Sequence, residues 1–226
     1  MSLDFNAKKT AEALRRKYNR NFICADTTDM VVEGYPRSSN TFTVDFLYLL
    51  MERAGKTGHI AHHTHDVTNL LLGLKLGVPA VVLLRDPVEA VASFMIYSDL
   101  DVTEAVQRYV DFYQPLQAVK RRTMIVPFEI LTGDFNVFVS ALNTRFGMSL
   151  PVSGDVAADS VIVKNIEAER GKKIYSEEDY ANRVAVPNEE RKAKAQAVRA
   201  EVEAFFARRP QAQNIYNSLM VEAIGS

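Results

Sequence analysis

The sequence predicts an α/β protein, a three-layer sandwich with a central parallel sheet between helices and a helical C-terminal region. Residues 79–84 read P-A-V-V-L-L, and such continuous apolar runs are typical of strands buried on both faces in parallel sheets. Further short apolar runs, at 30–32 and 124–128, alternate with segments of helical periodicity. This alternation is the order that builds a parallel sheet covered by helices.

Length and composition limit the class of protein. With 226 residues, of which 47% are hydrophobic, we expect one domain over 1–226 with a sizeable core. The net charge of −1 argues against a general nucleic-acid binder or a protein of anionic membranes, so any anion must be bound locally. The longest apolar stretch, 69–84, is interrupted by Gly, Lys and Pro, which argues against a membrane span. The single cysteine, Cys24, excludes an intrachain disulfide and fits a cytoplasmic, reducing compartment.

The N-terminal half contains the clearest helix signals. We expect a basic amphipathic helix over 8–18, within an N-terminal segment that spans residues 1–29, and then an α/β core over 30–146. A strand at 30–32 leads to a helix from Asn40 to Gly55, and 58–64 reads as a short strand. Asp66 is a good N-cap for the helix Val67–Leu76, which Gly77 ends.

Further along, Asp86 is a candidate N-cap with Pro87 at the first helical position. A long helix over 102–122, kinked at Pro115, precedes a strand at 124–128 and the helix Phe135–Phe146. Residues 147–188 show no helical pattern, and we interpret them as a mobile lid region lying over the site. Helices follow over 189–226, beginning with Glu189–Arg208, whose apolar stripe we assign to the core. The stripe comprises Val198, Val202, Phe205 and Phe206.

Residues 30–42, M-V-V-E-G-Y-P-R-S-S-N-T-F, form the first motif. A strand, a tight loop and a helix is how α/β folds build an anion site, because the first N–H groups of the helix have no intrahelical partner. Arg37 places a positive charge in the loop, and Ser38, Ser39 and Thr41 offer hydroxyl donors. The plain alternative is an ordinary strand-to-helix turn with an exposed arginine.

The second motif is R-D-P-V-E-A-V-A-S-F over residues 85–94. Arg85 follows the buried strand, at the same sheet edge as the first loop. Ser93 lies about two helical turns further on, so the two side chains can hold one phosphate from two sides. The alternative is that Arg85 only pairs with a nearby surface acid.

Together these motifs resemble the PAPS-dependent sulfotransferases, where PAPS is 3′-phosphoadenosine-5′-phosphosulfate. Residues 30–42 are similar to that family's 5′-phosphosulfate loop, Y-P-[KR]-S-G-[TN]-T-[WF], and 85–94 to its 3′-phosphate motif, R-[ND]-P-x-[DE]-x-x-x-S. Phe128-Glu129-Ile130-Leu131 is a weaker match to Y-E-D-L. The resemblance covers about 30–146, implies a P-loop-like strand-loop-helix and suggests a compact bacterial-type member.

The resemblance also implies roles for individual residues. Arg37 would contact the bridging oxygen of the phosphosulfate, and Arg85 and Ser93 would hold the 3′-phosphate. The 5′-phosphate would be bound by the loop and the helix start, namely Ser38, Ser39, Asn40, Thr41 and Phe42. Ser39 stands where the family has Gly, and its Cβ would displace the loop or weaken binding.

All four histidines lie within G-H-I-A-H-H-T-H-D. His63-Thr64-His65 resembles the family's K-T-H, in which the His is the general base. We therefore assign proton removal to His65, and a protonated His63 would replace the missing Lys. The alternative is a metal site, since His63 and His65 would share one face of a strand. Too few ligands accompany them, so we expect no metal, and we expect structural roles for His59 and His62.

The implied reaction is in-line transfer of the sulfuryl group from PAPS to a hydroxyl or amine acceptor, a small molecule or carbohydrate. Adenosine 3′,5′-bisphosphate is the product. The rivals are a P-loop small-molecule kinase, which would need G-x-x-x-x-G-K-[ST], and a non-catalytic nucleotide-binding module of the same fold. The acceptor and the oligomeric state stay open. So does the choice of the C-terminal basic residue that closes on the nucleotide, among Lys164, Arg170, Lys172, Lys173 and Arg183.

Overall fold

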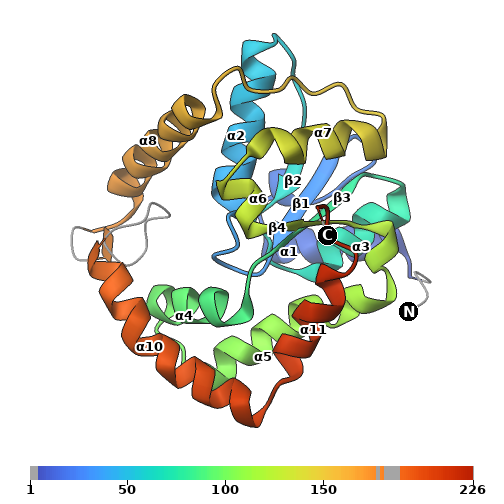
Figure 1. Cartoon of the computed structure of the whole chain (residues 1–226). Coiled ribbons are helices and arrows are strands. Elements are labelled where there is room, and N and C mark those ends of the chain that lie inside the picture. Colours follow the sequence, from blue (N-terminus) through green and yellow to red (C-terminus); the bar gives the residue numbers. More distant parts are fainter. Residues whose placement is uncertain (1–4, 177–178, 181–188, 226) are drawn as a thin grey trace.

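The computed structural model describes residues 5–176, 179–180 and 189–225, and its centre is a four-stranded parallel sheet (Figure 1). The strand order is β2-β1-β3-β4. The strands are β1 (Met30–Gly34), β2 (Ile60–His62), β3 (Ala80–Leu84) and β4 (Met124–Pro127). Strand β1 lies between β2 and β3 and is parallel to both, so the segments that follow these three strands meet at the carboxyl end of the sheet.

Helices cover both faces of the sheet, an arrangement compatible with a three-layer α/β fold. Successive strand residues alternate between the two faces: Val31 and Val82 belong to one hydrophobic cluster, Val32 and Val81 to the other. The first face carries α1 (Ala7–Lys17), α3 (Val67–Leu76), α4 (Pro87–Ser98), α5 (Val102–Tyr113) and α11 (Gln211–Met220). The second face carries α2 (Asn40–Arg53), α6 (Phe128–Thr132), α7 (Phe135–Phe146) and α8 (Val156–Ile174). Helix α10 (Glu189–Arg208) packs along α4, with Val202 and Phe206 of the predicted stripe buried.

The predicted capping signals are confirmed. The Asp66 carboxylate accepts a hydrogen bond from the Thr68 N–H at 2.9 Å, and Asp86 accepts from Val88 and Glu89 at the start of α4. Gly77 ends α3 in the left-handed conformation, with φ 76°. These side chains bond to the orphan N–H groups of the first turn, which is why the local sequence determines where the helices begin.

Two predicted elements are wrong in part. The predicted helix 102–122 ends at Tyr113, because Pro115 lacks an N–H and restricts the residue before it. The chain continues as the 3₁₀ turns η2 (Pro115–Ala118) and η3 (Lys120–Arg122). The strand predicted at 58–64 spans only Ile60–His62.

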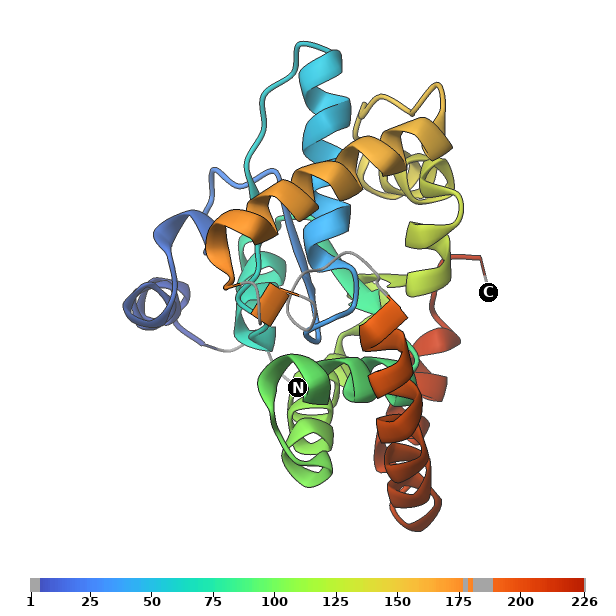
Figure 2. The same ribbon diagram turned by 90° about the vertical axis from the view of Figure 1, so that its left-hand side faces the viewer.

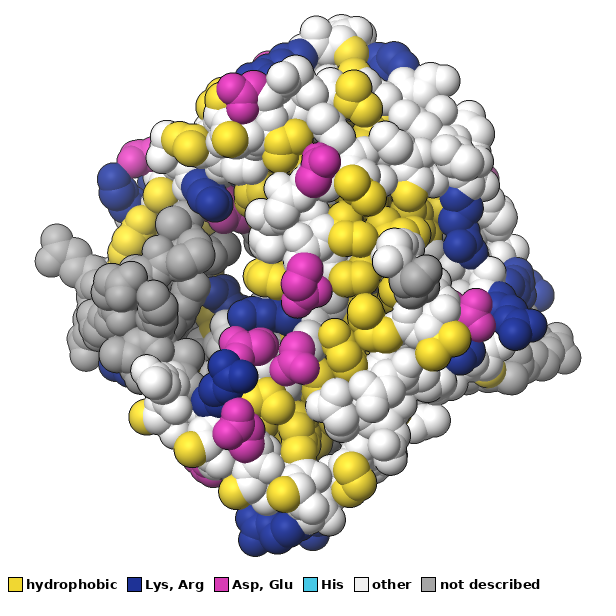
Figure 3. Space-filling model, in the orientation of Figure 1, with side chains coloured by type: hydrophobic (Ala, Val, Ile, Leu, Met, Phe, Trp, Pro, Cys, Tyr) yellow, Lys and Arg dark blue, Asp and Glu magenta, His cyan; other side chains and the backbone are white. Residues whose placement is uncertain are grey.

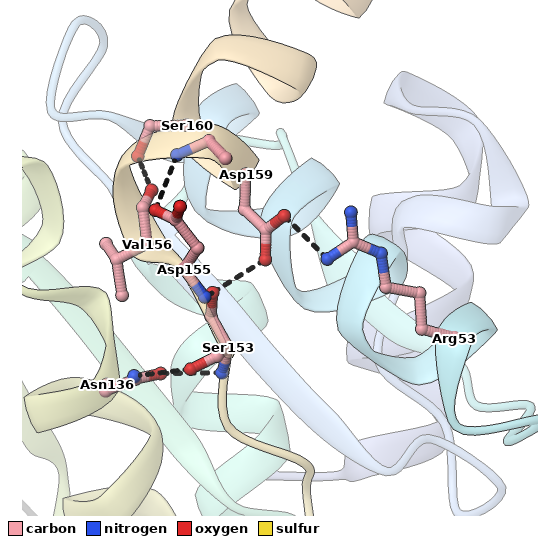
Figure 4. A network of polar contacts seen from close by, with 8 residues as sticks. Arg53, Asn136, Ser153, Asp155, Val156, Asp159 and Ser160 are labelled. Carbon is pink, nitrogen blue, oxygen red and sulfur yellow. Dashed lines mark hydrogen bonds and ion pairs between the residues drawn. The ribbon is translucent and has the colours of Figure 1, made fainter.

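The largest correction concerns 147–188, where the sequence showed no helical pattern. Residues Val156–Ile174 form the helix α8, which crosses over α2 (Figure 2). Its start is tied down by Asp159, which accepts hydrogen bonds from Arg53 of α2 and from Ser153, both at 2.6 Å (Figure 4). Asn136 of α7 makes two further bonds to the Ser153 backbone. Residues 177–178 and 181–188 of this region lie outside the described residues.

Candidate functional site

A cavity of about 1480 Å³ lies at the carboxyl ends of β1, β2 and β3. The space-filling view shows a hollow between α8, α2 and α4, with basic and acidic side chains side by side around it (Figure 3). The predicted site residues that line it are Arg37, Ser39, Asn40, Thr41, Phe42, His65, Arg85 and Ser93. Ser38 is the exception, because its side chain is fully buried beneath the loop. The two motifs and the histidine segment therefore face one space.

The loop between β1 and α2 has an unusual backbone. Arg37 and Ser39 have φ of 71° and 72°, a region that L residues rarely adopt. Ser39 is the N-cap of α2 but makes no side-chain capping bond. The orphan N–H groups of the first turn of α2 are therefore left to another acceptor, as in helix N-termini that bind phosphate. The same left-handed geometry explains why a Gly would suit position 39.

Gly34 and Tyr113 fix the start of this loop. A Cβ on Gly34 would lie 2.8 Å from the Leu83 carbonyl oxygen, so only glycine lets β1 run this close to β3. The Tyr113 hydroxyl donates to the Leu83 carbonyl at 2.6 Å and accepts from the Tyr35 N–H at 3.3 Å. The loop is thus held against the neighbouring strand by backbone packing and by a buried phenol.

Arg37, Arg85 and Ser93 meet at one end of the cavity. The Arg37 Nε donates to the Ser93 hydroxyl at 3.3 Å, and the Arg85 Nη1 donates to the Arg37 carbonyl at 2.8 Å. Arg85 also lies over the Phe128 ring, 4.4 Å from its centroid. Its Nη2 also lies 3.8 Å from the Glu89 carboxylate, one turn further along α4. Two guanidinium groups beside a helix N-terminus make this end of the cavity strongly favourable for an anion.

His65 is held at a defined angle. Its Nδ1 lies 2.7 Å from the Gly34 carbonyl oxygen, and since a carbonyl only accepts, Nδ1 carries the hydrogen. This contact selects the tautomer in which the other ring nitrogen, Nε2, carries the lone pair that a general base needs whenever the ring is neutral. Its backbone N–H donates to the buried Glu33 carboxylate at 3.0 Å. His65 also has a positive φ of 49°, so the ring is positioned by its backbone as well as by its hydrogen bond.

Glu33 holds the segment His63–His65 that follows β2, here called the histidine loop. The sequence did not reveal this role. The Glu33 side chain is completely buried and accepts from the Thr64 N–H, the Thr64 hydroxyl and the Asn69 amide at 2.9, 2.6 and 3.1 Å. Burial raises the pKa of this carboxyl, while His65 and the Thr64 and Asn69 hydrogen bonds oppose the shift. The available signal was an acid inside the apolar strand M-V-V-E-G, since buried acids need dedicated partners.

The other histidines differ from their expected roles in part. Burial, with the His62 charge next, lowers the pKa of His63 to about 3, so a protonated His63 in place of the family's Lys is not supported. Its Nε2 instead lies 2.9 Å from the Thr41 hydroxyl. His63 and His65 both follow the end of β2 and have positive φ, so they do not share the face of a strand. Among the residues that the structure describes, no group of three or more metal-binding side chains is placed to hold an ion.

His59 and His62 lie beside these residues in different settings. His59 bridges the Thr28 hydroxyl and the Asn21 carbonyl, at 3.2 and 2.8 Å, which supports its predicted structural role. His62 lines the cavity against the Phe22 ring, and burial lowers its pKa to about 4.

Helix α8 supplies the wall opposite the motifs. Of the C-terminal basic residues considered from the sequence, Lys164 and Arg170 line the cavity. Lys172 pairs with Glu169 at 2.7 Å on the exposed side of α8, and Lys173 lines a separate shallow surface depression. Arg183 lies outside the described residues. Arg170 makes a two-pronged pair with Asp45 of α2, at 2.9 and 3.1 Å.

No protein-family model, no curated protein and no solved structure matches this chain.

Unpartnered buried oxygens mark the same region. Within the described residues of the chain, the buried side-chain oxygens without a hydrogen-bond partner are those of Ser38, Asn40, Thr43 and Glu167. Asn40 and Glu167 line the cavity directly, and Ser38 and Thr43 flank the loop and the first turn of α2. The Asn40 amide donates to the Val32 carbonyl at 3.3 Å. Unsatisfied buried polar groups are rare, and the oxygens of Asn40 and Glu167 are the two of these four that a ligand in the cavity could reach.

Proposed function

We propose that this protein is a PAPS-dependent sulfotransferase that transfers a sulfuryl group to a hydroxyl or amine acceptor. The observation that carries the proposal is the meeting of Arg37, Arg85 and Ser93 at the N-terminus of α2, in the same cavity as His65. A nucleotide with phosphates at both its 3′ and 5′ positions presents anionic groups to two such strand-to-helix junctions at once. As part of this proposal, the β1–α2 junction acts as a P-loop-like phosphate-binding loop.

Each residue then has a place in binding. The backbone N–H groups at the start of α2, with the Thr41 hydroxyl, would hold the 5′-phosphate. Arg85, already oriented by Phe128 and the Arg37 carbonyl, would bind the 3′-phosphate together with Ser93. Arg37 would face the oxygen that bridges phosphorus and sulfur. The Asn40 side chain, engaged with β1, would contribute through its backbone.

The chemical step is an in-line displacement at sulfur. The acceptor oxygen forms a bond to sulfur while His65 Nε2 takes its proton, and the bond between sulfur and the bridging oxygen breaks. Adenosine 3′,5′-bisphosphate leaves with the negative charge on that oxygen, beside Arg37 and the α2 N-terminus. Fixed charges and dipoles stabilise a transition state most when they are aimed at the atom where charge develops.

The kinase alternative fits this site less well. A P-loop kinase needs an acid near the phosphates to bind magnesium. Asp86 follows β3 closely, but its carboxylate accepts the Val88 and Glu89 N–H groups as the N-cap of α4. The non-catalytic module is the second candidate, because Ser39 and the neutral His63 replace a Gly and a Lys of the family pattern. Turnover separates it from the enzyme.

Two measurements test the proposal. Thermal melting should show stabilisation by adenosine 3′,5′-bisphosphate and not by ATP with magnesium, since a ligand that binds only the native state raises Tm. An acceptor screen with ³⁵S-labelled PAPS should then detect transfer that Arg37→Ala and His65→Ala abolish. Arg145→Ala, at an exposed arginine of α7, is the matched control and should retain activity. Stabilisation by ATP alone would favour the kinase, and nucleotide binding without any transfer would favour the module.

A further inference from the structure

We propose that Glu167 of α8 binds the acceptor, and that the acceptor is a polar molecule with a second hydroxyl or amine besides the one that is sulfated. This inference rests on the proposed function and adds a substrate class to it. Simple phenols and monohydric alcohols lack the second donor and would be poor substrates.

The cavity is large enough for two substrates together. Ligand pockets of proteins usually measure about 300–1,000 Å³, whereas this cavity measures about 1480 Å³. The arginine end, between α2 and α4, matches the charge of the nucleotide. The part of the cavity lined by Glu167 of α8 and by the histidine segment after β2 is left for the acceptor.

Glu167 is a buried carboxylate with an unpaired oxygen in the wall of the cavity. The residue is 5% exposed and lines the cavity, and its Oε1 has no hydrogen-bond partner among the described residues. Burial, with Asp45 next, raises the pKa of this carboxyl to about 7, against the opposing charges of Arg170, Arg37 and Lys164. A buried oxygen without a partner costs stability, so an O–H or N–H of a ligand would bind there favourably.

The neighbours of Glu167 place this end of the cavity next to the base. Arg170 lies one helical turn beyond Glu167 on α8 and pairs with Asp45 of α2. Asp45 itself lies one helical turn beyond Thr41. Thr41 in turn contacts His63, two residues from His65. Rings of Phe22 and Tyr48 line the same cavity and offer flat apolar faces. A ring that carries several hydroxyls, as in a carbohydrate, fits aromatic faces with one carboxylate at the edge.

The test compares Glu167→Met with Glu169→Met. Methionine keeps the size of the side chain but accepts no strong hydrogen bond. Glu169 lies on the exposed side of the same helix, where it pairs with Lys172. For each protein we would measure Tm, the Kd of adenosine 3′,5′-bisphosphate, and kcat/KM for ³⁵S transfer from PAPS. The acceptor probes are methyl glycosides and amino alcohols, with cyclohexanol and phenol as monofunctional probes.

For Glu167→Met we expect an unchanged or higher Tm, an unchanged nucleotide Kd, and kcat/KM for the polar probes lowered by about 10- to 100-fold. Rates with cyclohexanol and phenol should change little, and Glu169→Met should resemble the wild type. A lower Tm, a weaker nucleotide Kd, or equal losses on all probes would overturn the role of Glu167. So would a wild-type enzyme that binds the nucleotide but sulfates no polar probe. A wild type that fails to bind the nucleotide would refute the proposed function itself.

Discussion

Glu33→Gln is the substitution that tests most sharply how the histidine loop is positioned. Glu33 Oε1 accepts three hydrogen bonds, from the Thr64 N–H, the Thr64 hydroxyl and the Asn69 amide, while Oε2 accepts the His65 N–H. Glutamine has one carbonyl oxygen and one NH₂ group in the same space. In the orientation that keeps the three bonds to Oε1, its NH₂ faces the His65 N–H, two donors without an acceptor.

The magnitude follows from these contacts. A hydrogen bond to a charged group contributes about 1.5–3 kcal/mol, and a buried donor left unpaired costs about 1–3 kcal/mol. Removing the buried charge offsets part of this loss, since burial raises the pKa of Glu33 and thus opposes ionisation. We therefore expect Glu33→Gln to lower the free energy of unfolding by about 2 kcal/mol. The proposed proton transfer to His65 should suffer more than nucleotide binding, because His65 loses the contact that fixes its backbone.

The assay combines urea unfolding with kinetics of the proposed sulfuryl transfer. Glu33→Gln should lower kcat with little effect on the Kd of adenosine 3′,5′-bisphosphate, because Glu33 lies on the histidine side and Arg85 is untouched. Glu52→Gln, at an exposed acid of α2, is the control and should stay within about 0.5 kcal/mol of the wild type. Wild-type stability and kcat in Glu33→Gln would refute the positioning role. So would an equal loss of nucleotide affinity.

Three further predictions concern the loop, the helix α8 and pH. Ser39→Gly should leave the free protein as stable or up to about 1 kcal/mol more stable, because glycine adopts the φ of 72° without strain. The same substitution should lower the nucleotide Kd, and weaker binding by calorimetry would contradict this. Asp159→Asn should speed amide hydrogen exchange in α8 more than in α7, since it weakens the bonds from Arg53 and Ser153; uniform protection would show that the tie is unimportant. Glu167 has a folded pKa raised to about 7 from its ordinary value near 4.5, so its contribution to stability is full below pH 4.5 and is lost as the pH rises through 7. The wild-type free energy of unfolding should therefore decline by up to about 3 kcal/mol more than that of Glu167→Gln between pH 4.5 and 8, measured by urea titration. Parallel pH curves for the two proteins would exclude this contribution of Glu167.

The elements of the fold that follow local rules could be predicted from the sequence. Asp66 and Asp86 mark helix starts because their carboxylates bond to free N–H groups, and Gly77 marks a helix end because it tolerates a positive φ. The buried strand 80–84 could be predicted because a two-sided core requires an unbroken apolar run. The sequence also predicted that Arg37 and Arg85 follow strands at one edge, and the parallel pairing of β1 with β3 brings them together.

Helix α8 could not be predicted from periodicity. Its inward positions recur every four residues but include Asp159, Glu167 and Gly171 with only one large apolar residue, Val163. Its exposed face carries Val161, Ile162 and Ile166, so the hydrophobic pattern points the wrong way. The helix is held by specific polar contacts and by its place over the cavity. Two of those contacts, Arg53 with Asp159 and Asp45 with Arg170, join residues more than 100 positions apart, and no local pattern reveals them.

Glu33 and Glu167 illustrate the same limit within the site. Each is a buried acid whose role is defined by partners on other elements: Glu33 by Thr64 and Asn69, and Glu167 by Asp45 and the cavity. A single sequence shows the residue type but not the burial that raises its pKa.

The most direct test of the central claim is a comparison of two nucleotides by calorimetry. The claim is that the two strand-to-helix junctions, joined through Arg37, Arg85 and Ser93, hold the 5′- and 3′-phosphates of one adenosine nucleotide. Wild-type protein should bind adenosine 3′,5′-bisphosphate at least about 10-fold more tightly than adenosine 5′-monophosphate, since Arg85 adds a charge-assisted bond to the 3′-phosphate. Arg85→Ala should erase that preference and Arg145→Ala should keep it. Equal affinity of the wild type for the two nucleotides would contradict the account.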